Sequence, residues 1–178
     1  MTRRHLLRLS AAVFVGTASH APLIAQTAAP PDSASATAEG AVRELYRLVS
    51  FAPGATTDWG KVRSLFLPEA VIFLRTSRTA STVFTLEGFI ADFAAFDTLP
   101  AVVQNGFTET IVRLRPTVFR DIAHVLVLYE ATIPGSPRPP QQGVDSFQLI
   151  RRDGRWWIVS VANDIVTPET PVPAELLP

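Results

Sequence analysis

Two apolar runs rich in β-branched and aromatic residues flank the dipeptide Asp153-Gly154 near the C-terminal end of the chain. Asp-Gly is favoured in two-residue primed turns, because both positions need a positive φ angle. We therefore predict a β-hairpin over residues 143–163. Without a bulge, its register sets Arg152 opposite Arg155, Leu149 opposite Ile158, Phe147 opposite Ser160 and Asp145 opposite Ala162. This pairing leaves the carboxylate of Asp145 on an apolar face.

Helical periodicity dominates the first half of the chain. Residues 36–51 carry apolar side chains at the three-and-four spacing of one helix face, with Tyr46 between the apolar and the polar faces. Asp58 is a good N-cap for a second helix ending near Phe66, and Thr85 for a third. The third helix has an aromatic stripe, formed by Phe89, Phe93 and Phe96. Core packing is the favoured interpretation of this stripe over a cofactor site.

The remaining segments alternate between strand and loop signals. We predict strands over residues 71–75, 82–84, 108–118 and 122–133, in addition to the hairpin. The tail 167–178 contains four prolines and is expected to be extended or disordered. Strands joined by short connections are mostly antiparallel, so the predicted class is α+β, with about three N-terminal helices on one face of the sheet.

Composition restricts the possible functions. The chain is long enough for one domain, expected over residues 36–166, and its formal net charge is zero. Its basic residues are scattered, which argues against a nucleic-acid partner. Cysteine is absent and histidine is scarce, so we expect neither a disulfide nor a metal site, and no motif indicates a cofactor.

The N-terminal segment is typical of an export signal. A basic start, a short apolar run and small residues follow one another over residues 1–25, and the sequence TRRHLLR is similar to a twin-arginine motif. About 10 apolar residues are too few to span a membrane. We therefore expect a cleaved signal peptide, a flexible lead-in over residues 26–35, and a location in the bacterial periplasm or outside the cell.

The element order resembles that of the nuclear transport factor 2-like superfamily. The similarity rests on WGKVRSLFLPEAVIF from Trp59, DIAHVLVLYEA from Asp121 and GVDSFQLIRRDGRWWIVSV from Gly143. The resemblance implies a cone-shaped, strongly curved sheet wrapped around helices, with an apolar pocket inside. The superfamily includes SnoaL-like polyketide cyclases, ketosteroid isomerase and scytalone dehydratase, so the fold alone does not decide the activity.

Comparison with ketosteroid isomerase implies roles for individual residues. In that enzyme a tyrosine and a protonated aspartate form an oxyanion hole, and a second aspartate is the base. Asp145 matches the protonated aspartate, and Tyr46 lies near the place of the tyrosine. The position of the base is occupied by Leu74, and Glu69 is the closest carboxylate on that segment. This departure argues against the same isomerase chemistry.

Two ionisable residues are the main site candidates from the pattern itself. Desolvation on an apolar face would raise the pKa of Asp145, unless hydrogen bonds or a cation such as Arg113 compensate. His124 alternates with Ile122, Leu126 and Leu128, which would place its ring on a buried surface. Each residue also has a structural interpretation, as an ion-paired carboxylate and as a hydrogen-bonded core histidine.

Three functional hypotheses follow. The first is an exported domain that binds a small, largely apolar molecule, with Trp59, Phe89, Phe93 and Phe147 lining the pocket. The second is a cofactor-free isomerase, cyclase or dehydratase with Asp145, Tyr46 and His124 as catalytic residues. The third is an association module with a vestigial pocket. Because the last strands are apolar on both faces, a homodimer is also expected.

Overall fold

The structure, a computed structural model, describes residues 33–77 and 79–178. The described elements are η1 (Ser33–Ala36), α1 (Ala38–Val49), α2 (Trp59–Ser64), β1 (Phe66–Arg75), β2 (Ser81–Thr85), α3 (Leu86–Asp97), α4 (Pro100–Asn105), β3 (Thr108–Phe119), β4 (Ile122–Thr132), β5 (Gln141–Arg152), β6 (Arg155–Ile165) and η2 (Ala174–Leu176). The strands form a sheet in the order β2-β1-β6-β5-β4-β3. Strands β1 and β6 are parallel, and the other neighbours are antiparallel. The predicted α+β class is confirmed.

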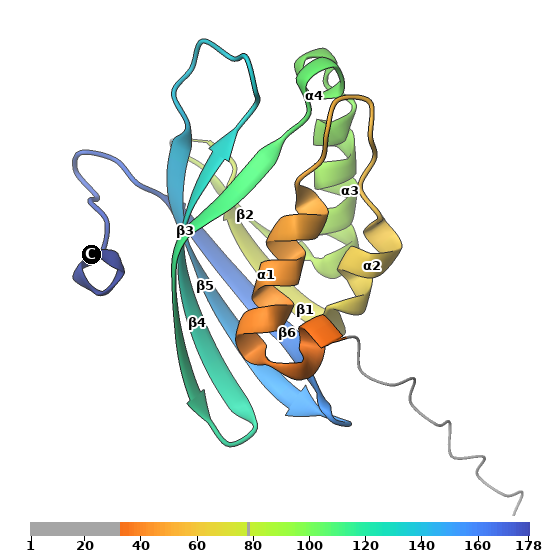
Figure 1. The fold of residues 1–178 in the computed structure, drawn as a ribbon, viewed down its shortest axis with the longest axis vertical. Coiled ribbons are helices and arrows are strands. Elements are labelled where there is room, and N and C mark those ends of the chain that lie inside the picture. The colour runs from red at the N-terminus through yellow and green to blue at the C-terminus, as the bar shows by residue number, and fades with distance from the viewer. Residues whose placement is uncertain (1–32, 78) are drawn as a thin grey trace, which may run out of the picture.

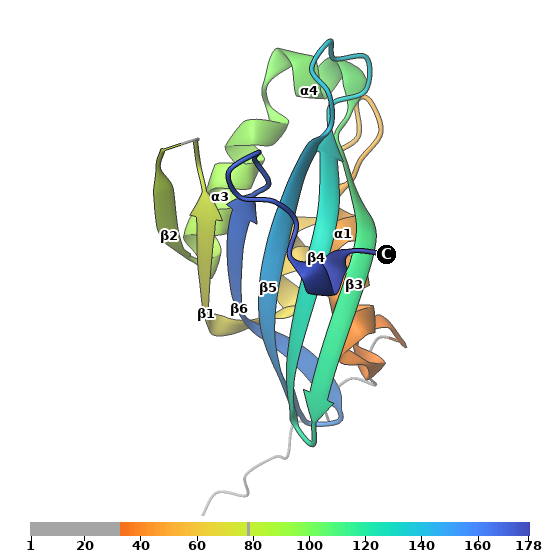
Figure 2. The same ribbon diagram turned by 90° about the vertical axis from the view of Figure 1, so that its left-hand side faces the viewer.

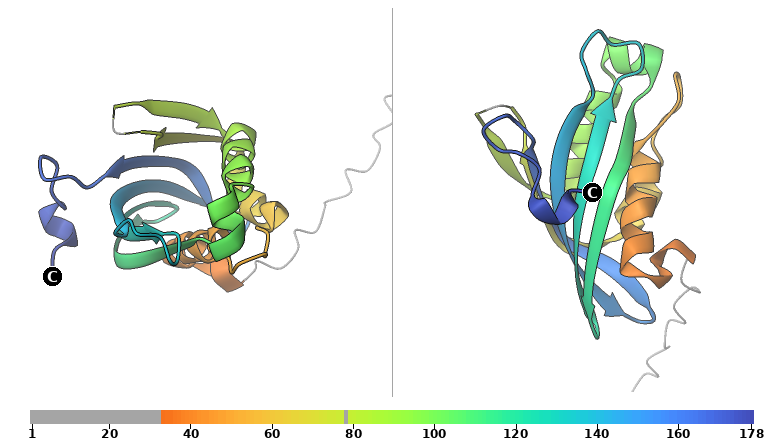
Figure 3. Two further views of the ribbon diagram at one scale, coloured as in Figure 1. Left: turned by 90° about the horizontal axis from the view of Figure 1, so that it is seen from above. Right: turned by 60° about the vertical axis from the view of Figure 1, so that its left-hand side comes forward.

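The sheet is strongly curved, and the helices lie on its concave side (Figure 1 and, seen from above, Figure 3). Buried side chains of α1, α3 and the strands form one hydrophobic core between the two layers. Helix α4 was not predicted, because six residues beginning with a proline are too short to show helical periodicity. The expected signal peptide, residues 1–25, lies outside the described residues.

Helix α1 follows the predicted amphipathic pattern closely. The Thr37 side chain accepts a hydrogen bond from the Gly40 amide at 2.9 Å, which caps the first turn. The apolar positions of the helix are buried against the sheet, and Tyr46 is only 4% exposed. The lead-in expected to be flexible ends in η1, where Ser35 is fully buried and accepts a hydrogen bond from Arg155. Its last residues therefore belong to the packed structure.

Strand β1 is longer than predicted. It begins at Phe66, which was assigned to the second helix, and it includes Pro68 and Glu69. The Leu65 carbonyl accepts a hydrogen bond from the Ile158 amide at 2.9 Å, so β1 joins β6 directly after α2. The pairing then shifts between Phe66 and Val71. A proline lacks an amide donor and is tolerated at such an irregularity.

The C-terminal hairpin contains a bulge that the prediction lacked. The turn at Asp153-Gly154 forms as expected, with φ angles of 55° and 77°. Leu149 pairs with Ile158, but Gln148 pairs with Ser160, so Val159 is the extra residue. The predicted register is therefore wrong by one residue beyond Leu149. Phe147 faces Val161, and Asp145 faces Asn163 instead of Ala162.

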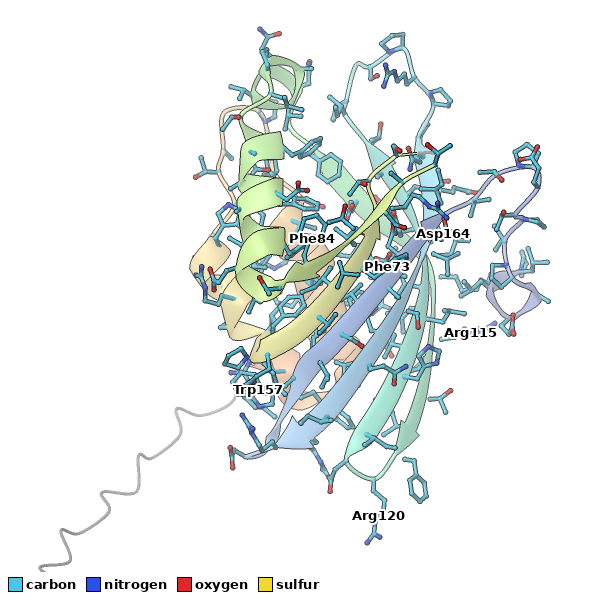
Figure 4. The ribbon with its side chains drawn as sticks, turned by 180° about the vertical axis from the view of Figure 1, so that it is seen from behind. Phe73, Phe84, Arg115, Arg120, Trp157 and Asp164 are labelled. Atoms are coloured by element: carbon cyan, nitrogen blue, oxygen red, sulfur yellow. The ribbon has the colours of Figure 1, made fainter. Side chains whose placement is uncertain are left out.

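The proline-rich tail packs on the convex side of the sheet. Helix η2 lies against β3 and β4, as Figure 2 shows, and Leu176 is only 1% exposed. Arg115, labelled in Figure 4, donates from Nε to the Glu175 carbonyl oxygen at 3.0 Å. The tail was expected to be extended or disordered, and this packing corrects the disordered alternative. Among the described helices, none is long and apolar enough to cross a membrane.

Candidate functional site

A cavity of about 550 Å³ lies between the concave face of the sheet and helices α1 and α3. Of the four predicted pocket residues, Phe89, Phe93 and Phe147 line it. Trp59 does not; its ring packs on Phe93 with centroids 6.0 Å apart, farther into the helical layer. The prediction for Trp59 is therefore corrected. An aromatic side chain on a short amphipathic helix faces the core, but sequence does not show which core residues border an open space.

A hydrogen-bonded polar cluster occupies one wall of the cavity. Tyr46 donates from its hydroxyl to Oδ2 of Asp145 at 2.5 Å. Asn163 donates from Nδ2 to Oδ1 of Asp145 at 2.7 Å and to the Tyr129 hydroxyl oxygen at 2.9 Å. These side chains come from α1, β4, β5 and β6. The structure thus brings two predicted site residues, Tyr46 and Asp145, into direct contact.

The end of α1 is fixed to β3 by a serine. Ser50 donates from its hydroxyl to the Tyr46 carbonyl oxygen at 2.8 Å and accepts from the Glu109 amide at 2.9 Å. The same contact brings Tyr46 and Glu109 to neighbouring parts of the cavity wall, which both side chains line. Ser50, at the end of α1, therefore helps to fix the positions of Tyr46 and Glu109 in the cavity wall.

Gly143 makes room for the second tyrosine. It pairs with Tyr129 across β4 and β5, and a Cβ atom at Gly143 would overlap the Tyr129 hydroxyl. The Tyr129 ring therefore lies over the glycine backbone, where its hydroxyl reaches Asn163. A glycine inside a strand often marks such a close approach.

Asp145 is the more acidic of the two enclosed carboxyl groups that line the cavity, the other being Glu109. Burial raises its pKa to about 6, and the hydrogen bonds from Tyr46 and Asn163 oppose this rise. Both oxygens of the carboxyl group accept a hydrogen bond, an arrangement that favours the ionised form. Asp145 is therefore largely a carboxylate at neutral pH, in contrast to the protonated aspartate that the resemblance implied.

Glu109 is the second carboxyl group. Burial and then the charge of Asp145 raise its pKa to about 8. Its backbone bonds to Ser50, but within the described part of the chain its carboxyl group has no hydrogen-bond partner. Glu109 is therefore mostly protonated at neutral pH. The two groups form a pair with different environments, a pattern found at acid–base sites.

The two tyrosines of the cluster remain neutral. Burial, followed by the charge of Asp145, raises the pKa of Tyr46 well above its usual value. The pKa of Tyr129 is raised by the same two effects. Both hydroxyls therefore act as hydrogen-bonding groups and not as phenolates.

His124 lies on the other side of the sheet. Asp145 pairs with Val127, and Ala123, Val125, Val127 and Tyr129 form the inward face of β4. His124 is one position out of phase, and its Nε2 lies 3.0 Å from the Ser146 hydroxyl on the outer face. The expectation that His124 shares a pocket with Asp145 is corrected. The predicted burial of Ile122 is also wrong, because that side chain is 58% exposed.

Sequence reasoning missed Glu109 and Asn163. Glu109 alternates with Phe107 and Ile111, which predicts an inward side chain, but a buried glutamate was not expected from the apolar pattern. Asn163 was missed because the bulge at Val159 shifts its pairing by one residue.

Leu74, at the position of the ketosteroid isomerase base, does line the cavity, whereas Glu69 is exposed and does not. Arg113 makes no ion pair with Asp145, whose partners are Tyr46 and Asn163.

The described residues contain no group of three or more His, Cys, Asp or Glu side chains that could hold a metal ion. The polar wall consists instead of carboxyl, hydroxyl and amide groups, which bind and move protons or accept hydrogen bonds.

Solved structures of other proteins share this fold. A candidate dehydratase of the nuclear transport factor 2-like family from Streptomyces avermitilis superposes with a TM-score of 0.55 and 15% identity, covering 71% of this chain and 91% of that one. A candidate ketosteroid isomerase from Shewanella frigidimarina gives 0.53 and 18%, covering 75% and 96%. A candidate calcium/calmodulin-dependent protein kinase type II association domain from Thiobacillus denitrificans gives 0.57 and 11%, covering 74% and 96%.

The chain therefore has the fold of the nuclear transport factor 2-like superfamily, as the sequence resemblance indicated. No family model matches the sequence, and no curated protein does. The similar structures have been given different candidate functions on one architecture, and their low identities show the fold alone.

Proposed function

We propose that this protein binds a small, largely apolar molecule in its cavity, with the polar end of that molecule against Asp145. The observation that carries the proposal is the position of the Tyr46–Asp145–Asn163 cluster in the wall of a cavity of about 550 Å³, whose lining also includes several aromatic and aliphatic side chains. Pockets of this size with few convergent polar groups are typical of small-molecule sites.

Aromatic side chains contribute to the apolar part of the cavity lining. Phe93 and Phe96 project from α3 towards Phe107, with centroid distances of 6.3 and 4.9 Å to that ring. Tyr46 and Phe147 continue this aromatic lining from α1 and β5. The cavity remains open despite these large side chains, which argues against a pocket filled by its own phenylalanines.

The test is a ligand-dependent melting screen with steroids, polyketides, terpenoids and fatty acids. A binder should raise the melting temperature of the wild-type protein by mass action. For Asp145→Asn the rise should be smaller, while the protein without ligand stays folded. A cavity that binds no compound of any class, or an Asp145→Asn variant with an unchanged ligand response, would contradict the proposal.

Acid–base catalysis without a cofactor is the second candidate function. The observation that favours it is the pairing of a carboxylate, Asp145, with a mostly protonated carboxyl group, Glu109, in one cavity. Asp145 would take a proton from a carbon next to a carbonyl group, and Glu109 would donate a proton or hydrogen bond to the carbonyl oxygen. Glu109 thus takes the acid role that His124 cannot fill from the outer face.

Substrate turnover tests this second function. With any isomerisation or dehydration substrate found in the screen, Asp145→Asn should lower kcat by about 100-fold or more, as for loss of a general base. His124→Gln should leave kcat unchanged. Equal losses in both variants would refute the assignment of the base.

Export and self-association are separate proposals. The N-terminal sequence is the support for export to the periplasm or the medium. A homodimer is supported by exposed apolar side chains on the outer side of β1 and β2, including Phe73 (Figure 4), Val71 and Val83. The presence of candidate association domains among the similar structures also supports the proposal of self-association. A monomeric mass by light scattering at micromolar concentration would refute the dimer.

A further inference from the structure

We infer that the molecule bound in the cavity is an organic cation: an amine whose ammonium group lies between Glu109 and Asp145 and whose apolar body lies against the aromatic wall. This inference rests on the proposed binding function and names its ligand class. It is carried by two enclosed carboxyl groups without a protein counter-cation, in a cavity lined with aromatic rings.

The first observation is the missing positive partner. Neither Glu109 nor Asp145 forms an ion pair with an arginine, lysine or histidine anywhere in the described ranges. Buried carboxylates in proteins are usually paired with a cation or bound to a metal. A ligand that brings its own positive charge would supply the partner that the fold lacks.

Charged groups near the opening do not supply that partner. Arg75 lines the cavity but is held by Asp164, whose carboxylate lies 2.7 Å from its guanidinium group. Arg138 lines the cavity from the exposed loop before β5, and Asp92 lines it from α3. The positive groups therefore lie in an exposed loop or an existing ion pair, while the inner wall is acidic.

The second observation is the aromatic lining around the acidic wall. Tyr46 and Tyr129 have ring centroids 5.9 Å apart, and Tyr46 and Phe147 have centroids 6.3 Å apart. All three rings border the cavity. Ring faces attract an ammonium group through their quadrupoles, an interaction used by aromatic cages for amine ligands. A carboxylate ligand would instead face the negative charge of Asp145.

Amine binding should release a proton. Glu109 is mostly protonated without ligand at neutral pH, and a neighbouring ammonium group favours its ionised form. The affinity should therefore rise with pH up to about 8 and then level off while the amine stays protonated. The titratable groups facing Glu109 are Asp145, Tyr46 and Tyr129, and only Asp145 changes charge in the lower part of this range.

The experiment uses three isosteric probes on the full-length chain: benzylamine, benzyl alcohol and benzoate. Calorimetric titration gives their affinities and, in two buffers of different ionisation enthalpy, the number of protons released. Benzylamine should bind about tenfold or more tightly than the alcohol, as expected for charge-assisted hydrogen bonds. Benzoate should bind more weakly than both.

Two matched variants separate the site charge from the general charge of the protein. Glu109→Gln should lower benzylamine affinity about tenfold at the pH plateau, abolish proton release, and leave benzyl alcohol affinity within about twofold. Glu39→Gln removes the same charge from the exposed face of α1 and should change none of these values. Both variants are checked for folding by their melting curves before titration.

The outcomes distinguish the ligand class from the cavity itself. If benzyl alcohol binds as tightly as benzylamine, or benzoate binds most tightly, the amine inference is overturned and the binding cavity stands. If benzylamine binds but Glu109→Gln leaves its affinity and proton release unchanged, the assigned site is wrong. If none of the probes binds and the melting screen also finds no ligand, both the binding function and the amine ligand class are refuted.

Discussion

The two faces of β5 show how one strand can carry two kinds of polar chemistry. Asp145 points into the cavity, where Tyr46 and Asn163 bind it, whereas the next residue, Ser146, faces outward and bonds to His124. The inner carboxyl group has a raised pKa because it is enclosed. The outer polar groups can exchange their partners for water. Neighbouring residues of similar polarity therefore have different environments, which depend on the face of the sheet that they occupy.

Glu109→Gln should have the largest effect, and its sign depends on pH. The pKa of Glu109 is raised from 4.5 to about 8, so the native state holds this proton more tightly than the unfolded state does. Wild-type stability therefore falls as pH rises between these values. Relative to wild type, the variant should gain about 3 to 5 kcal/mol in free energy of unfolding between about pH 5 and pH 9.

Urea unfolding at several pH values measures this difference. The matched control is Glu130→Gln on β4, whose side chain accepts a hydrogen bond from Gln142. Glu130 has the same outward parity as His124 on β4, so its substitution leaves both Glu109 and Asp145 in the cavity unchanged. If the stability difference from wild type varied with pH in the same way in both variants, it would not come from the enclosed position of Glu109.

Leu176→Ala tests whether the outer face depends on the tail. Leu176 is nearly fully buried where η2 meets β3 and β4. Loss of this side chain should lower the free energy of unfolding by about 2 to 4 kcal/mol, if the tail is part of the cooperative unit. Leu177→Ala, at a 49% exposed position next to it, is the control. Equal, small losses in urea unfolding would show that the tail is not docked in solution.

Gly143→Ala should disturb the inner cluster from within the sheet. The added methyl group would displace the Tyr129 ring and break its hydrogen bond with Asn163. We expect a loss of about 1 to 3 kcal/mol in free energy of unfolding. The control Gly60→Ala, in α2, should have a smaller effect, because alanine favours the helix and the added methyl group would meet only the exposed Asp58 carboxylate, at 3.3 Å. A neutral Gly143→Ala would mean that Tyr129 has room to move.

Periodicity in the sequence was sufficient to predict the helices α1 and α3, the hairpin turn and the α+β class. These features depend on local patterns, such as the capping residues Thr37 and Thr85 and the positive φ angles at Asp153-Gly154. The candidate site was predicted in part, through Tyr46 and Asp145. Asn163 was missed because a single extra residue at Val159, which has no local signal, moved it opposite Asp145. Glu109 has the parity of an inward side chain, but the apolar pattern did not predict a buried glutamate. His124 was placed on the wrong face for another reason: β4 has apolar residues at both parities, so alternation does not show which face is inward.

His124→Gln should have the smallest effect and is the most direct test of the two-face comparison. Glutamine can keep a hydrogen bond to Ser146, so the free energy of unfolding should change by less than about 0.5 kcal/mol. Ligand-induced melting shifts should also match those of wild type, while Asp145→Asn reduces them. The two residues lie on adjacent strands, so a general disturbance of the sheet would affect both variants. A loss of ligand response only in Asp145→Asn therefore follows from the face occupied, whereas equal losses would mean that the outer face contributes to binding.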